Sequence, residues 1–200
     1  MNLSLIGGVI GLLVDIPLVI GILKGKIIQN YVTYFLWGVL DVIIFATIIF
    51  QNGKNFWLSL FYAVGSFTVA IFLVFKGQTK WTRIESMVIF LIIICMIIWW
   101  QIGSKAANIA AVVALGIASI PQILDTIKNP NFTPTGIYLI YSFAAFLSFV
   151  GGENWNVKDK LYPGGALVLS ILITILSMRK MRAMWLHQLL SFESPYKVFW

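Results

Sequence analysis

The residue with the most distinctive chemistry in this sequence is Asp41, an acid near the middle of an apolar run over about residues 31–50. An ionised carboxylate in a membrane interior costs ~2.5–3.5 kcal/mol, so it normally faces a partner or a cavity. Trp37 lies four residues earlier, on the same face of a helix. An aromatic wall beside a carboxylate suits a polar or cationic metabolite, or a proton-coupling site. The structural alternative is a hydrogen bond from Asp41 to a serine or backbone group, with Trp37 only packing.

A second acid, Asp15, lies two residues before Pro17 in the first apolar run. A proline removes one helical hydrogen bond and kinks the helix, and the freed carbonyl then needs a partner or a wet cavity. Pro121 and Gln122 interrupt a later apolar run in the same way. We therefore expect hinges at both prolines, with Gln122 bonded to the opened backbone or lining a pathway. Asp15 fits two roles equally well, solvating the broken helix or binding a coupling ion.

The elements that carry these residues are membrane spans. Of the 200 residues, 60% are hydrophobic and 10% are charged, with a mean hydropathy of +0.94. Soluble domains carry roughly 25% charged residues, and apolar runs long enough to cross ~30 Å of hydrocarbon recur along this chain. The apolar runs do not alternate with polar residues as barrel strands do. The sequence predicts an all-α membrane protein with seven spans, at about 3–23, 31–50, 56–75, 86–102, 107–127, 134–151 and 161–178.

The basic residues predict the orientation of these spans. One side would carry Lys24, Lys26, Lys76, Lys80, Arg83, Lys128, Arg179, Lys180, Arg182 and Lys197. The other side would carry only Lys54, Lys105, Lys158 and Lys160. Because Lys and Arg accumulate in cytoplasmic loops, we expect the N-terminus outside and the C-terminus in the cytoplasm. The net charge of +7 is therefore a topology signal and gives no reason to expect nucleic acid as a partner.

A repeat with a spacing of 104 residues runs through the chain. It aligns Pro17 with Pro121, and span boundaries and basic loop residues keep the same register. Three spans, one linker span and three further spans give two repeats that enter the membrane from the same side. The expected divisions are 1–80 for the first repeat, 81–106 for the linker helix, 107–180 for the second repeat and 181–200 for a basic amphipathic tail. A pathway between two such halves is the usual use of this arrangement.

The repeat also predicts how the two halves differ. The mates of Trp37 and Asp41 are Tyr141 and Ala145. One half would supply the charge, and the other a phenol together with Ser142. We expect a substrate site made by Trp37, Asp41, Tyr141 and Ser142.

In this layout, the chain resembles the PQ-loop and SWEET-like (MtN3-type) transporters. The resemblance rests on Pro121-Gln122 with Lys128, on Pro17 with Lys24, and on Trp37 to Asp41. It implies a carrier with three, one and three helices. The first repeat has Pro17-Leu18 in place of Pro-Gln, and spans three and seven lack the asparagine of sugar-carrying members. The stretch from Trp37 to Gly152 also resembles an uncharacterised bacterial family of small membrane proteins.

These patterns favour a carrier that moves a small polar metabolite (a sugar, an amino acid or a vitamin-like compound) by alternating access. Proton coupling and homo-oligomerisation stay open. The alternative is a non-transporting membrane receptor or accessory subunit on the same scaffold. The chain carries no phosphate loop, zinc motif or nucleophile elbow, so we expect no enzyme, catalytic residue, metal or cofactor. The expected surroundings are the lipid bilayer, in the cytoplasmic (inner) membrane of a bacterium.

Overall fold

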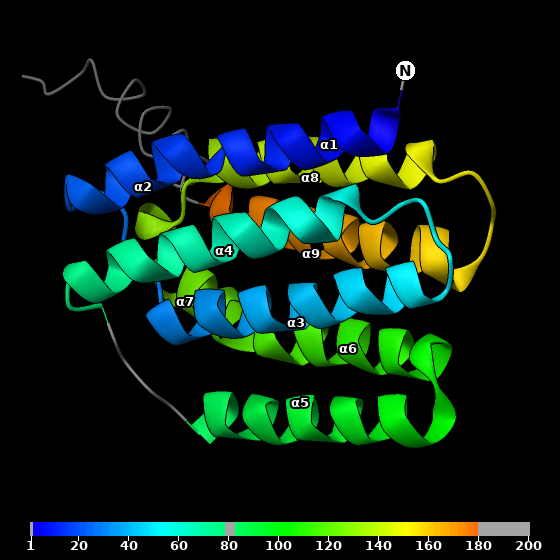
Figure 1. The fold of residues 1–200 in the computed structure, drawn as a ribbon. Helices are drawn as coiled ribbons and strands as arrows, with labels where there is room; N and C mark the ends of the chain where they lie inside the picture. Colours follow the sequence, from blue (N-terminus) through cyan, green and yellow to red (C-terminus); the bar gives the residue numbers. More distant parts are fainter. Residues whose placement is uncertain (1, 79–82, 180–200) are drawn as a thin grey trace, which may run out of the picture.

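The computed structural model describes residues 2–78 and 83–179, which form a bundle of long apolar helices (Figure 1). Within these two ranges there is no β-strand. The prediction of an all-helical protein is therefore confirmed for the described chain. The expected basic tail, 181–200, lies outside the described residues.

Seven helical rods make up the described bundle, and two of them are broken. The first rod is α1 (Leu3–Leu13) followed by α2 (Asp15–Leu23), and the fifth is α6 (Ser104–Ala118) followed by α7 (Ile120–Lys128). The unbroken rods are α3 (Tyr31–Phe50), α4 (Trp57–Phe75), α5 (Arg83–Ile102), α8 (Thr135–Gly151) and α9 (Tyr162–Ser177). Two short turns complete the described helices, η1 (Pro130–Phe132) before α8 and the π-helical η2 (Val157–Leu161) before α9.

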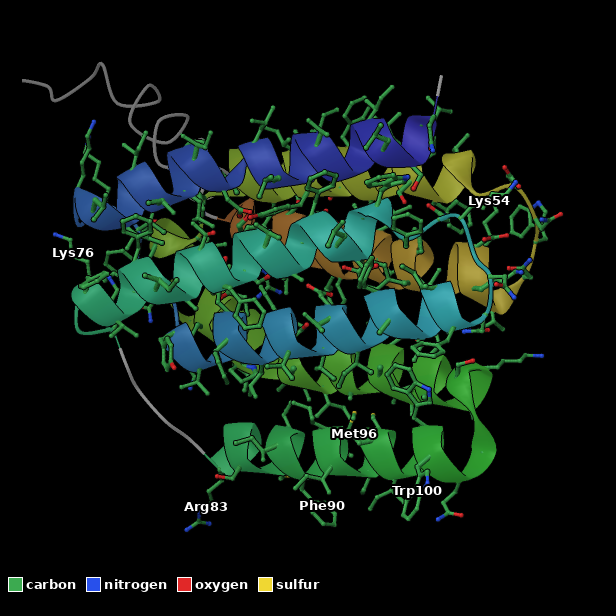
Figure 2. The ribbon with its side chains drawn as sticks, in the orientation of Figure 1. Lys54, Lys76, Arg83, Phe90, Met96 and Trp100 are labelled. Carbon is green, nitrogen blue, oxygen red and sulfur yellow. The ribbon has the colours of Figure 1, made fainter. Side chains whose placement is uncertain are left out.

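Five helical segments are long and apolar enough to cross a membrane. They are Leu3–Leu23, Tyr31–Phe50, Trp57–Phe75, Ser104–Lys128 and Val157–Ser177. Ser86–Ile102 and Thr135–Gly151 are shorter apolar helices. Large apolar side chains are also exposed on the outside of the bundle, and Figure 2 shows Phe90 and Trp100 on the side of α5 that points away from the other helices. Together these features identify an integral membrane protein.

The two broken rods are interrupted next to the predicted prolines. The first break is at Val14 and the second at Ser119, three and two residues before Pro17 and Pro121. Proline has no N–H to donate and fits the first turn of a helix, so a new helix begins just before each one. The surroundings differ, because Pro17 is exposed on the outside of the bundle and Pro121 is buried.

The packing places α1 between α4 and α8, and places α3 between α4 and α6. Helix α9 packs mainly against α8 and, near the second break, against α7. Helix α5 lies at the edge of the bundle, where it packs chiefly on α6 (Figure 1). The centre of the bundle is therefore surrounded by helices other than α5.

Small residues allow α1 to approach its neighbours closely. A Cβ added at Gly7 would collide with the carbonyl oxygen of Ala144 on α8, and one added at Gly8 would meet Trp57 and Phe61 on α4. Without a hydrophobic effect between helices in lipid, such small residues promote packing by allowing close backbone contact. These glycines thus hold α1 against two other rods.

We predict that Gly7→Ala lowers the stability of the protein by about 1–3 kcal/mol, because the new methyl group has to push α1 away from the α8 backbone. Thermal unfolding of the purified full chain in detergent measures the change. The matched control is Gly116→Ala on α6, where an added Cβ has open space within 4 Å. The control should leave the midpoint unchanged or raise it slightly, and equal losses in both variants would contradict the packing argument.

Candidate functional site

A cavity of about 80 Å³ lies inside the bundle. A single water molecule needs roughly 10–15 Å³ of cavity volume. The cavity therefore has room for several water molecules or a compact ligand. Its lining comes from α2, α3, α4, α6, α8 and α9 and from the second helix break. The lining residues are Asp15, Tyr34, Trp37, Asp41, Tyr62, Ser66, Leu115, Ser119, Tyr138, Tyr141, Tyr162, Ala166, Leu169, Ser170 and Ile173.

Asp41 contributes one of the two carboxyl groups of the cavity. It lies near the middle of α3 and is only 2% exposed. The hydroxyl group of Tyr162, at the start of α9, donates a hydrogen bond to Asp41 Oδ1 at 2.8 Å. A hydrogen bond to a carboxyl group is among the stronger ones, so Tyr162 fixes the orientation of this acid.

Asp15 contributes the second carboxyl group at the first helix break. It is 5% exposed, and the hydroxyl group of Tyr141 on α8 donates a hydrogen bond to Asp15 Oδ1. A side chain at Gly65 on α4 would collide with Asp15 Oδ2. The absence of a side chain at this glycine therefore makes the room that the carboxyl group occupies.

Trp37 lies on α3, one turn before Asp41, and faces the second helix break. Its Nε1 donates a hydrogen bond to Ser119 Oγ at 3.1 Å, and Ser119 Oγ in turn donates to the carbonyl oxygen of Leu115 at 2.8 Å. The ring of Trp37 meets Tyr34 edge to face, with the ring centroids 5.0 Å apart. The indole ring of Trp37 therefore lies between Ser119 at the second helix break and the ring of Tyr34.

Several lining contacts come in pairs that the 104-residue spacing relates. Tyr141 is the mate of Trp37 and Asp15 is the mate of Ser119, so the Tyr141–Asp15 bond is the counterpart of the Trp37–Ser119 bond. In both cases the donor on an unbroken helix holds the residue at a helix break. Other lining pairs at this spacing are Tyr34 with Tyr138, Tyr62 with Ala166, and Ser66 with Ser170.

Aromatic side chains form much of the cavity wall. Tyr62 is central among them, with its ring centroid 5.5 Å from that of Tyr141 and 6.5 Å from that of Tyr162. Its hydroxyl group donates to the carbonyl oxygen of Tyr141 at 3.1 Å. The hydroxyl oxygens of Tyr34 and Tyr138 lie 3.3 Å apart. Because Tyr62 contacts the partners of both acids, the two carboxyl groups belong to one site.

The charges around this cavity are unbalanced. Asp15 and Asp41 both line it, and no lysine, arginine or histidine is among its described lining residues. A buried carboxylate without a cation nearby carries a desolvation penalty of several kcal/mol. The neutral donors Tyr141 and Tyr162 offset only part of this penalty. The site therefore favours a proton or a positively charged ligand over an anion.

Buried polar contacts join several elements at the end of the bundle where α1 begins. Asn55 is at the centre of a buried group that also includes Ser4, Ser148 and Asp159, which we call the Asn55 network. Asn55 Nδ2 donates to the carbonyl oxygen of Ser148 at 3.0 Å and to that of Asp159. Asn55 Oδ1 accepts from Ser148 Oγ at 3.0 Å and from Ser4 Oγ. The network ties the loop before α4 to α1, α8 and η2.

The structure brings four of the predicted site residues to the cavity and leaves four outside its lining. Trp37, Asp41, Tyr141 and Asp15 all line it. The four that do not line the cavity are Ser142, Gln122, Pro17 and Pro121.

Two of these four use their polar groups elsewhere in the protein. Ser142 is buried on α8, and its Oγ donates to the carbonyl oxygen of Tyr138 at 2.9 Å. Gln122 is buried on α7, with Nε2 3.4 Å from Thr126 Oγ1. Successive residues of a helix point about 100° apart, which is why Ser142 turns away from the cavity that Tyr141 faces.

Sequence reasoning missed most of the hydroxyl groups around the two acids. Tyr34, Tyr62, Tyr138 and Tyr162 line the cavity, as does Ser119 at the second break. A signal existed for one pair, because Tyr34 and Tyr138 are identical residues at the 104-residue spacing. Tyr62 and Tyr162 lack such a signal, since their mates are Ala166 and Leu58.

The described residues contain no group of three His, Cys, Asp or Glu side chains arranged to hold a metal ion. Comparison with known proteins finds no matching family model, no matching curated protein and no matching solved structure. The chemistry of the cavity therefore has to be argued from its own side chains.

We predict that Tyr162 and Asp41 are energetically coupled. In a double-mutant cycle with Tyr162→Phe and Asp41→Leu, a substitution that removes the acceptor, the coupling free energy should be about 0.6 kcal/mol and at most about 1.7 kcal/mol, the average and the maximum for hydrogen bonds between membrane helices. Unfolding of the full chain in mixed micelles measures it. The control pairs Tyr162→Phe with Asp125→Asn, an exposed acid on α7, and these two changes should be additive. A zero coupling for the first pair would contradict the hydrogen bond.

Proposed function

We propose that this protein is a membrane carrier that moves a small polar metabolite by alternating access between two three-helix repeats. The observation that carries the proposal is the cavity between the helices, whose lining includes five pairs of residues 104 positions apart. Each pair takes one residue from 1–80 and the other from 107–180. A ligand in this cavity would therefore contact both halves, as a carrier requires.

The packing of the helices supports two related halves, although the close packing of α1 on α4 has only a weak counterpart between α6 and α9. Helix α3 packs on α4 in the first half as α8 packs on α9 in the second. Across the halves, α1 packs on α8 as α6 packs on α3. This exchange of equivalent contacts is what a two-fold relation between the halves would produce, with α5 as the linker.

Contacts between residues 104 positions apart support a two-fold symmetry axis that runs along the bundle. Tyr34 contacts Tyr138, and Asn55 contacts Asp159, and each pair is 104 residues apart. Symmetry mates can touch only close to the axis that relates them. Tyr34 is near the start of α3 and Asn55 lies beyond its end, so the two contacts mark points at different depths on a line roughly parallel to the helices. A parallel repeat in a membrane has an axis in that direction.

The proposed orientation has the Asn55 network outside. The end of the bundle with Lys76 would face the cytoplasm and the end with Lys54 the exterior (Figure 2). By its size, composition and resemblance, we assign the carrier to the cytoplasmic membrane of a bacterium. In this orientation the described conformation has its outer end closed, and the Asn55 network has to separate when the carrier opens outward.

The helix breaks at Val14 and Ser119 are the proposed hinges. At each break, a residue that lines the cavity is bonded to the other half, Asp15 to Tyr141 and Ser119 to Trp37. Occupation of the cavity would thus act directly on both hinges. Proton coupling through Asp15 or Asp41 is compatible with this arrangement and stays open.

The carrier proposal predicts that a disulfide across the outer end stops transport. The hydroxyl oxygens of Ser4 on α1 and Ser148 on α8 are 3.4 Å apart and belong to different halves. In a Cys95→Ala background, oxidation of Ser4→Cys with Ser148→Cys should abolish uptake into proteoliposomes, and a reducing agent should restore it. The substrate is the compound that most raises the melting temperature in a screen of sugars, amino acids, amines and vitamins.

The matched control is Thr126→Cys with Thr133→Cys, whose hydroxyl oxygens are 3.0 Å apart within the second half. This cross-link does not join the halves, so transport should continue after oxidation. Full transport with the Ser4–Ser148 cross-link in place would overturn the alternating-access proposal. A ligand that binds but is never taken up would instead favour a receptor on this scaffold.

A further inference from the structure

Starting from the proposed carrier function, we infer the chemical class of its substrate. We propose that the cavity binds a small organic cation, an ammonium ion held by the carboxyl groups of Asp15 and Asp41 and by the aromatic rings around them. The proposal rests on three features of the lining, namely its charge, the use of its hydrogen-bond donors, and its aromatic faces.

The charge of the lining favours a cation. Both carboxyl groups are at least 95% buried, and the described lining contains no basic side chain to neutralise either one. Among the described residues, each acid receives one side-chain hydrogen bond, Asp15 from Tyr141 and Asp41 from Tyr162. A ligand with a positive charge would remove the desolvation penalty that a neutral ligand leaves in place. An anion would add to it.

Most hydrogen-bond donors of the lining are already used within the protein. The exceptions among the described residues are Ser66 and one hydroxyl group of the Tyr34–Tyr138 pair, since only one of these two can donate to the other. The hydroxyl groups of Tyr62, Tyr141 and Tyr162 each donate to a carbonyl or carboxyl oxygen. The indole N–H of Trp37 donates to Ser119, which itself donates to a backbone carbonyl.

Ser170 on α9 also donates a hydrogen bond to a backbone carbonyl. Its Oγ lies 2.8 Å from the carbonyl oxygen of Ala166. The lining therefore offers mainly acceptors to a ligand. A sugar needs donors as well as acceptors from its site, whereas a primary ammonium group has only donors and a quaternary ammonium group needs no donor from the site.

The aromatic faces of the lining complete the site. A cation is attracted to the face of a Trp or Tyr ring within about 6 Å of the ring centre, and Trp provides the strongest attraction. Trp37 lies one turn from Asp41 and meets Tyr34, while Tyr62 meets the phenol rings that are bonded to both acids. An ammonium ion in the cavity would thus be surrounded by rings with the carboxyl groups at its side.

The test compares ligands that differ in charge but hardly in shape. The first pair is choline and 3,3-dimethyl-1-butanol, its uncharged carbon analogue, and the second is n-butylammonium and n-butanol. Thermal shift and calorimetric titration of the purified full chain in detergent measure binding. At least one cation should raise the melting temperature and bind at least about tenfold more tightly than its uncharged partner. Equal binding of the two partners, or no binding of either cation, would overturn the proposal.

Substitutions at the acids then test which carboxyl groups bind the cation. Asp41→Asn and Asp15→Asn should each weaken binding of the cation by about tenfold or more, while Asp125→Asn, which removes an exposed acid of the same type, should not change it. Trp37→Phe keeps an aromatic ring and should weaken binding less than either acid substitution. Cation binding that survives both acid substitutions would refute the site. The comparison of charged and uncharged ligands on the unmodified protein remains decisive if a variant does not fold.

Uptake into proteoliposomes separates this proposal from the proposed function. If the cation binds through Asp41 but is not taken up, the carrier function fails and the cation site stands. If an uncharged metabolite is taken up and no cation binds, the carrier function stands and the cation site fails.

Discussion

Polar groups inside a membrane have to find their partners within the protein, and this constraint decides the architecture of the cavity. Two prolines interrupt helices in the bundle, and two acids lie among apolar rods. At each break, a residue of the other half supplies a donor, Trp37 for Ser119 and Tyr141 for Asp15. The hydrogen bonds that hold the polar side chains at the breaks are therefore also bonds between residues of 1–80 and residues of 107–180. Stability and the shape of the cavity depend on the same few contacts.

In the proposed repeat, residues 104 positions apart share similar contacts but differ in their chemistry. An indole donates to a hydroxyl group on one side of the cavity, and a phenol donates to a carboxyl group on the other. Asp41 has Ala145 at the equivalent position, and its partner Tyr162 has Leu58. Both acids thus come from the first half, and the phenols that bind them come from the second.

The sequence alone predicted the helices well, because long apolar runs bounded by Gly, Asn, Lys and Pro leave little freedom in their limits. The span predicted at 31–50 coincides with α3, and the breaks fall within three residues of the predicted prolines. Asp15 and Asp41 were found because charge is rare and expensive in such runs. Tyr62 and Tyr162 were not, because a tyrosine in an apolar helix gives no signal until its neighbours are known. The orientation and the repeat stay predictions.

Helix α5 joins the halves from the edge of the bundle and contributes nothing to the described lining of the cavity. Helix α5 also bears on how many carboxyl groups the two halves together place around the cavity. Two copies of the first half would place four acids around one cavity, whereas two copies of the second half would have Ser119 and Ala145, and no acid, at the corresponding positions. In the proposed organisation, this tether pairs one first half with one second half, so that the cavity of each molecule receives two carboxyl groups, each bonded to a phenol.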